Sequence, residues 1–249
     1  MLKVNDLNKH FGGVQALLGI DFSLQENEIL GVIGPNGAGK TTLFNALSGT
    51  LTVNSGKIFF RDKEITHFPP QKRSRMGIMR TFQNLSLYDD LTLQENVILG
   101  ANAWYRPGLK DIFDLKSSKY TKTLPTAIDN LSLVGLEGQR HNYPDNLSYG
   151  NQRKLEIARA LTGKPKLLLL DEPAAGLNNH ESEELAELLL HIRDNFKLTI
   201  LIIEHDMDVL TNFSDRVLVL VEGGLLTVDT PSNIQKDKRV INAYLGSEI

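Results

Sequence analysis

The sequence predicts an α/β fold with a mixed sheet, and three observations support it. The runs Leu167–Leu170 and Ile200–Ile203 are entirely apolar, as expected of strands that are buried on both faces. The segment Glu181–Arg193 between them has the spacing of an amphipathic helix. Residues 84–165 show helical patterning and few strand-like runs. Buried strands alternating with helices favour a parallel sheet covered on both faces, here with an inserted helical subdomain.

The N-terminal third supplies strands of another kind. Residues Leu18–Leu24 alternate apolar and polar side chains, and Lys57–Phe60 is a further short strand, so antiparallel strands are expected before the parallel sheet. The run Ile29–Ile33 leads into a glycine-rich turn, and a helix is predicted over Lys40–Ser48. Within the helical insertion we expect a loose middle and breaks at the prolines, which are Pro107, Pro125 and Pro144.

Composition narrows the class of protein. The chain has 249 residues, of which 41% are hydrophobic and 23% charged, as in an ordinary globular domain. Its net charge of −3 gives no indication of a nucleic-acid partner. The absence of cysteine excludes disulfides, thiol catalysis and cysteine-based metal sites. No apolar run approaches the roughly 20 residues that a membrane span needs, and the start lacks a signal-peptide pattern, so we expect a cytoplasmic protein.

Residues 34–41 read GPNGAGKT and lie between the predicted strand and helix. This spacing is typical of a phosphate-binding loop, in which glycines allow the backbone to wrap around phosphate and the helix N-terminus attracts the anion. Lys40 would bind the β- and γ-phosphates, and the Thr41 hydroxyl would bind Mg²⁺. The pattern alone leaves an ATPase, a GTPase and a kinase open. The residues predicted to bind nucleotide here are Gly34, Pro35, Asn36, Gly37, Ala38, Gly39, Lys40, Thr41 and Thr42.

Two carboxylates follow the apolar strand in LLLLDEP, residues 167–173. Asp171 ends the strand, so its side chain is expected at the carboxyl edge of the sheet, where it can hold Mg²⁺. Glu172 suits a general base that orients or deprotonates the attacking water. The alternative is that Asp171 merely caps a helix that begins near Asn178.

Residues 147–152 read LSYGNQ and precede a helix predicted over 153–163. This resembles the LSGGQ signature of the ABC ATPase family. Further marks of that family follow the same order: Gln83 matches the Q-loop glutamine, AAGLN at 174–178 the D-loop, and His205 the switch histidine. Phe11 matches the aromatic residue that stacks on adenine, although a core position is its alternative. The signature departs from the pattern at Tyr149 and Asn151, and the D-loop departs at Asn178.

The resemblance implies a single P-loop NTPase (RecA-like) nucleotide-binding domain over residues 1–249, with a core of 1–83 and 166–249 and a helical signature subdomain of 84–165. It implies an ATPase that uses ATP and Mg²⁺ and acts as a head-to-tail dimer, in which Lys40 of one subunit and Ser148 of the other hold one γ-phosphate. The implied catalytic residues are Lys40, Glu172 and His205. The implied metal ligands are Thr41, Gln83 and Asp171, and the additional nucleotide contacts are Phe11, Gln83, Ser148 and Gly150.

Longer segments of the sequence around these motifs resemble one branch of the family, the ATPases of branched-chain (hydrophobic) amino acid importers of the LivG type. The resemblance is clearest in RTFQNLSLYDDLTLQENVILG at 80–100 and IIEHDMDVL at 202–210. Such an ATPase would sit on the cytoplasmic side of the inner membrane with permease subunits and a second ATPase, and with a periplasmic binding protein as indirect partner. The alternatives are an ABC ATPase that serves transport of urea or short amides, one that serves lipopolysaccharide export, and an ABC ATPase with no transport role. Leu85, Leu87, Tyr88 and Leu91 would form a partly apolar dock for the permease, with the core of the helical domain as their alternative. A solvated basic face is the interpretation of Lys72, Arg73, Arg75 and Arg80, with contact to lipid headgroups or a permease loop as its alternative.

Overall fold

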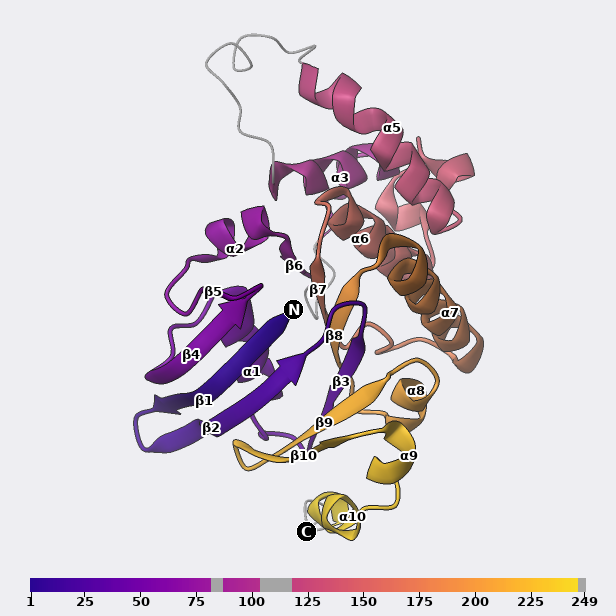
Figure 1. The fold of residues 1–249 in the computed structure, drawn as a ribbon. Coiled ribbons are helices and arrows are strands. Elements are labelled where there is room, and N and C mark those ends of the chain that lie inside the picture. Colours follow the sequence, from indigo (N-terminus) through magenta and orange to yellow (C-terminus); the bar gives the residue numbers. More distant parts are fainter. Residues whose placement is uncertain (82–86, 104–117, 246–249) are drawn as a thin grey trace.

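Figure 1 shows the computed structural model of the chain, which describes residues 1–81, 87–103 and 118–245. Its strands join in one mixed sheet in the order β5-β4-β1-β2-β10-β9-β3-β8-β7-β6. The strands are β1 (Leu2–Phe11), β2 (Val14–Leu24), β3 (Ile29–Ile33), β4 (Ser55–Phe60), β5 (Lys63–Glu64), β6 (Ile78–Arg80), β7 (Leu167–Asp171), β8 (Thr199–Ile203), β9 (Arg216–Val221) and β10 (Gly224–Asp229).

The pairing divides this sheet into two parts. Strands β9, β3, β8, β7 and β6 run parallel to one another, and β10 pairs antiparallel with β9. Strands β1, β2, β4 and β5 pair antiparallel, and the parallel contact of β10 with β2 joins the two parts. The predicted mixed sheet with N-terminal antiparallel strands is therefore confirmed.

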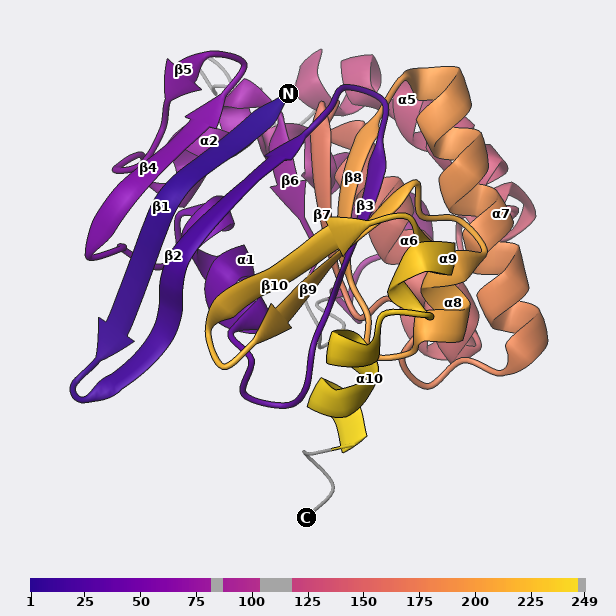
Figure 2. The ribbon, with the colours of Figure 1, turned by 60° about the horizontal axis from the view of Figure 1, so that its bottom comes forward.

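The parallel strands bury side chains on both faces. In β7, Leu167 and Leu169 belong to one core cluster, whereas Leu168 and Leu170 belong to the other, because successive side chains of a strand point to opposite faces. Helix α1 (Lys40–Ser48) covers the first face and lies between the parallel strands and β2 (Figure 2). Helix α7 (Asn179–Phe196) covers the second face, and α6 (Tyr149–Thr162) lies on the same side of the sheet.

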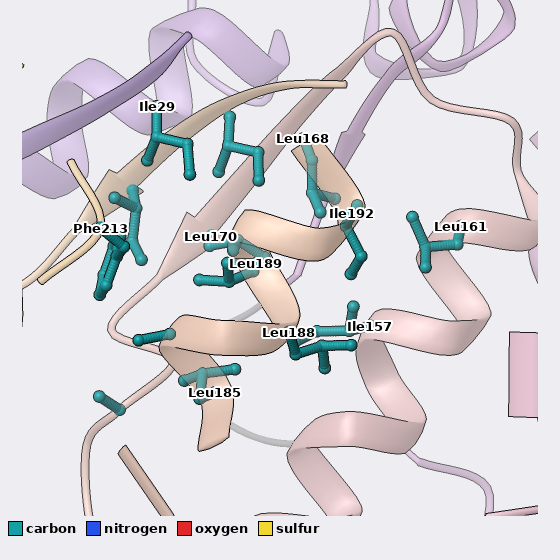
Figure 3. Close-up of a cluster of buried hydrophobic side chains, with 14 of the residues drawn as sticks. Ile29, Ile157, Leu161, Leu168, Leu170, Leu185, Leu188, Leu189, Ile192 and Phe213 are labelled. Atoms are coloured by element: carbon teal, nitrogen blue, oxygen red, sulfur yellow. The ribbon is translucent and has the colours of Figure 1, made fainter. Parts of the chain in front are cut away.

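Helix α7 fills the space between the sheet and α6. In Figure 3, Leu189 points toward Leu170 of β7, and Leu188 points toward Ile157 of α6. Each fully buried leucine of this kind contributes roughly 2 kcal/mol through the apolar surface that it removes from water.

The described part of the insertion is helical, and α3, α5 and α6 pack on one another. The division of the chain into a core and a helical subdomain stays a prediction. The expected break at Pro125 is wrong, because this proline lies inside α5. Ala127 and Leu131, on the same helix, are fully buried, so packing offsets the loss of one helical hydrogen bond. The elements are α3 (Leu93–Leu99), η1 (Gly100–Ala103), α5 (Ser118–Leu133), η2 (Glu137–Gln139) and η3 (Pro144–Asn146).

The remaining helices are short, and one of them corrects a prediction. Arg73 belongs to α2 and is 1% exposed, so it is not part of a solvated basic face. Its guanidinium donates to the carbonyl oxygens of Ala46 and Leu47 in the last turn of α1, where helical carbonyl groups lack a full set of partners. The helices are α2 (Pro70–Met76), α8 (Met207–Thr211), α9 (Pro231–Ile234) and α10 (Lys238–Leu245).

Leu189→Ala should lower the free energy of unfolding by about 2–5 kcal/mol, because it leaves a cavity between α7 and β7. Urea unfolding followed by circular dichroism measures this change. Phe196→Ala is the control on the same helix, since its ring is 54% exposed and should cost about 1 kcal/mol or less. Equal losses in the two variants would contradict the packing described here.

Candidate functional site

The predicted phosphate-binding loop joins β3 to α1, and its backbone requires glycine at two positions. Gly34 has φ of 155° and Gly39 has φ of 98°, both in the region that disfavours side chains. A Cβ at Gly34 would lie 2.1 Å from the carbonyl oxygen of Leu220, and one at Gly39 would lie 2.3 Å from that of Ala16. Strands β9 and β2 therefore confine the loop on two sides, which fixes the direction of its N–H groups.

Lys40 is the first residue of α1 and is 8% exposed. Its Nζ donates to the carbonyl oxygens of Gly34, at 2.5 Å, and Pro35, at 3.0 Å. Burial lowers the pKa of Lys40, and the negative charge of Glu172 partly offsets this effect. The phosphate-loop cation and the predicted base therefore lie within electrostatic reach of each other.

The other predicted loop residues differ in their exposure. Thr41 is exposed at the N-terminus of α1, where its hydroxyl can reach a ligand. Tyr244 of α10 hydrogen-bonds with the backbone of Gly34, a contact that sequence reasoning missed because the two residues are far apart in the chain. Among the rest, Asn36 and Gly37 are exposed, Pro35, Gly39 and Thr42 are half-buried, and Ala38 is buried.

Asp171 and Glu172 stand at the carboxyl edge of the sheet, as predicted. Asp171 is the last residue of β7 and is 3% exposed. Glu172 is half-buried and has φ of 47°, the left-handed region, and its N–H donates to the carbonyl oxygen of Ile203 at 3.0 Å. This turn directs successive carboxylates differently, at a backbone cost of order 1–3 kcal/mol.

Arg80, the last residue of β6, pairs with Asp171. Its Nη2 lies 2.7 Å from Oδ2 of Asp171, and the two side chains are 9% and 4% exposed. The interpretation of Arg80 as part of a solvated basic face is therefore wrong. That interpretation failed because a charged residue in a short window gives no sign of its distant partner.

The residues present fit Mg²⁺ better than a metal held wholly by protein. No cluster of three or more His, Asp or Glu side chains suited to a metal occurs within 1–81, 87–103 and 118–245. Mg²⁺ prefers one or two protein oxygens completed by water and phosphate oxygens. The carboxylate of Asp171 and the hydroxyl of Thr41 are donors of that kind.

The predicted switch residue His205 is exposed and follows β8. Its neighbour Glu204 is 1% exposed and accepts a hydrogen bond of 2.8 Å from the N–H of Ala174 in the D-loop. Burial raises the pKa of Glu204 to about 7, and the charges of Glu172 and Asp206 add to this effect. Sequence reasoning missed Glu204, although a carboxylate directly after an apolar strand was the available signal.

The signature segment forms the start of α6. Ser148 is its N-cap, and its Oγ accepts from the N–H of Asn151 at 3.3 Å. The helix therefore begins four residues before the predicted 153. Gly150 is packed against α7, because a Cβ there would lie 2.9 Å from Oε1 of Glu181.

The phosphate loop and the signature segment open helices on opposite faces of the sheet. Helix α1 contributes Leu43 and Phe44 to one core cluster, whereas α6 contributes Leu155 and Ile157 to the other. The structure thus brings Lys40 close to Glu172 and its neighbour Asp171, whereas Ser148 begins a helix on the other side of the sheet from α1.

Two predicted contacts remain. Phe11 is 50% exposed at the end of β1, so the core alternative is wrong, and Nζ of Lys9 lies 4.8 Å from its ring centre. Gln83, predicted to contact nucleotide and metal, lies outside the described residues, and so does Leu85.

Comparison with known proteins agrees with this geometry. The chain matches the ABC transporter family over residues 17–175. It is 41% identical to the high-affinity branched-chain amino acid transport ATP-binding protein LivG of Escherichia coli K12, covering 99% of this chain and 98% of the relative. It is 38% identical, with the same coverage, to the corresponding protein BraF of Pseudomonas aeruginosa.

A crystal structure of the ADP conformation of an ATP-binding cassette from an ABC transporter superposes with a TM-score of 0.89. That cassette is 30% identical, and the match covers 99% of this chain and 98% of the cassette. Phosphate loop, edge carboxylates and serine-capped signature helix all lie within this near-complete match. The chain belongs to the ABC transporter ATP-binding family.

Proposed function

We propose that this chain is the ATP-hydrolysing subunit of an importer that carries branched-chain, hydrophobic amino acids across the inner membrane. The observation that carries the proposal is the near full-length identity of 41% to LivG, whose name states that transport, in a chain that keeps the phosphate loop and both edge carboxylates. The cargo does not touch this subunit in such a system, so the substrate rests on the relatives.

The site residues divide the chemistry of hydrolysis among them. Loop N–H groups and Lys40 would bind the phosphates, with Lys40 exchanging its two carbonyl partners for phosphate oxygens. Mg²⁺, held through Thr41 and Asp171, would neutralise charge on the phosphates. Glu172 would orient and deprotonate the water, and His205 would contact the γ-phosphate. Gln83 would complete the metal shell, and Phe11 would stack on adenine.

A second ATPase subunit follows from the placement of the two anion-binding helices. Because α1 and α6 lie on opposite sides of one sheet, we assign Ser148 and Gly150 to the nucleotide of a partner cassette. Each ATP would then join two subunits, and its hydrolysis would release them. The N-terminus of α6 would supply the positive end of the helix dipole to the γ-phosphate.

The permease would dock on the turn before α3. Tyr88 is 56% exposed there, while Leu87 and Leu91 are half-buried. The buried Asn96 fixes this turn, since it bonds with both the N–H and the carbonyl oxygen of Tyr88. Within the described residues, no helix is long and apolar enough to cross a bilayer, so membrane-spanning chains are assigned to the partners. A periplasmic binding protein would deliver the cargo to them.

Deletion of this gene in its source organism should abolish uptake of labelled leucine, and the wild-type chain should restore it. Glu172→Gln should not restore uptake, because loss of the base slows hydrolysis by about 10²-fold or more. The exposed Glu187→Gln on α7 is the matched control and should restore uptake fully. Intact uptake of leucine, isoleucine and valine in the deletion strain, with loss of urea uptake or lipopolysaccharide export, would contradict the proposed cargo.

The two-subunit site is tested at Ser148 in the Glu172→Gln background. With saturating ATP and Mg²⁺, Glu172→Gln should elute as a dimer from size exclusion. Adding Ser148→Asp should leave a monomer, because the carboxylate repels the γ-phosphate. Adding Ser148→Asn should preserve the dimer, and both substitutions retain a good N-cap for α6. Equal dimerisation of the Asp and Asn variants would argue against this role for Ser148.

The link between Glu204 and Ala174 predicts a pH dependence of stability. The folded carboxyl keeps its proton up to about pH 7, whereas the unfolded one loses it near 4.5, so the folded state binds more protons between these values. Stability therefore falls as pH rises through this window, by roughly 3 kcal/mol in all.

Glu204→Gln keeps the oxygen that accepts from Ala174 and has no proton to lose. Its stability relative to wild type should rise from pH 4.5 to pH 7 in urea unfolding at several pH values. The exposed Glu187→Gln serves again as the control. A difference between Glu204→Gln and wild type that stays constant with pH would refute the buried, proton-holding carboxyl.

A further inference from the structure

Arg80 lies outside the family motifs, yet it connects three elements of the nucleotide site, namely α1, β6 and β7. Its Nη2 donates to Oδ2 of Asp171 at 2.7 Å, and its Nη1 donates to Oδ1 of Asn45 at 2.6 Å and to Oγ of Ser48 at 3.2 Å. The guanidinium also lies 5.8 Å from the ring centre of Phe44. Phe44, Asn45 and Ser48 belong to α1, so one side chain of β6 joins the phosphate-loop helix to the metal carboxylate on β7.

Burial makes this arrangement costly unless the charges compensate each other. Arg80 and Asp171 are 9% and 4% exposed, and a buried ion pair is stable only when hydrogen bonds also satisfy the remaining donors. The planar fork of arginine places its two Nη groups on partners in two directions, α1 and Asp171, which the single ammonium of lysine cannot reproduce. Arg80 is thus the cation that Asp171 faces before any metal arrives.

We propose that Arg80 is a positioning residue that holds Asp171 by one carboxylate oxygen and competes with Mg²⁺ for its negative charge. This inference rests on the proposed function. The pairing fixes the carboxylate against α1, and the nearby positive charge weakens the metal's attraction to it. Arg80 thereby sets the concentration of Mg²⁺ at which nucleotide is held.

Arg80 is also close in sequence to the predicted Q-loop glutamine. It lies three residues before Gln83, which the family pattern assigns to the nucleotide and the permease joint. Strand β6 thus carries Arg80 at its end, directly before that segment. The end of β6 therefore carries the partner of Asp171 and leads in sequence into the segment that contains Gln83.

The test compares Arg80→Met, Arg80→Lys and wild type in binding a fluorescent ADP analogue while free Mg²⁺ is varied. Arg80→Met should lower the half-saturating Mg²⁺ concentration roughly ten-fold, because it removes a unit charge close to Asp171. Arg80→Lys keeps the charge and should return the value most of the way to wild type. Arg75→Met, at an exposed arginine of α2, is the matched control and should not differ from wild type.

Thermal unfolding separates this role from a purely structural one. Without ligand, Arg80→Met should melt below wild type, since Asp171 loses its counter-charge, and the rise in Tm caused by Mg²⁺ with ADP should exceed that of wild type. An unchanged or higher half-saturating Mg²⁺ concentration in Arg80→Met would overturn the inference, as would Arg80→Lys behaving like Arg80→Met. Failure of wild type to bind the nucleotide at all would overturn the proposed function instead.

Discussion

The arrangement of this chain depends on parallel strands that bury side chains on both faces. All five residues of β7 and of β8 are buried, and their backbone groups are used in pairing with neighbouring strands. Charged groups can therefore reach solvent and ligand only where the strands end. Asp171 and Glu204 occupy those ends, and the phosphate loop leaves β3 at the same edge because β3 and β8 run parallel.

That edge concentrates opposite charges in a poorly solvated place. Lys40 and Arg80 face Asp171, Glu172 and Glu204 across three neighbouring strands and one helix. Burial lowers the pKa of Lys40 and raises that of Glu204, so both groups favour their neutral forms more than they would in water. Glu204 also joins the segment after β8 to the segment after β7, because its carboxyl accepts from the N–H of Ala174.

The sequence predicted those features whose cause is local. The spacing of glycines in GPNGAGKT requires only the strand before it and the helix after it, and the alternation of β2 follows from a period of two. The burial of Arg73 and Arg80 could not be predicted from local sequence. Their partners, Ala46 and Asp171, lie 27 and 91 positions away, so four basic residues within nine positions looked like a solvated face.

The environments of Pro125 and Glu204 were not predicted correctly, for a related reason. A proline within a helix is tolerated when tertiary packing offsets its lost bond, and the neighbours that offset it come from α3 and α6. Glu204 lies between an apolar strand and the predicted switch histidine, and neither neighbour indicates that its carboxyl is buried. Its hydrogen bond reaches back 30 positions to Ala174. In each case a residue's environment was decided by chain segments that sequence proximity does not reveal.

The departures from the family pattern occupy one contact region, and this explains why they are compatible with it. Tyr149 takes a glycine position, and its ring packs over Gly176 of the D-loop, where a Cβ would lie 3.3 Å from Cε1. Its hydroxyl accepts from Arg153 at 3.0 Å, which anchors the ring to its own helix. Asn178 replaces aspartate yet forms a capping box with Glu181, and asparagine caps as well as aspartate does. Because Glu181 also packs against Gly150, the signature helix, the D-loop and the start of α7 contact one another.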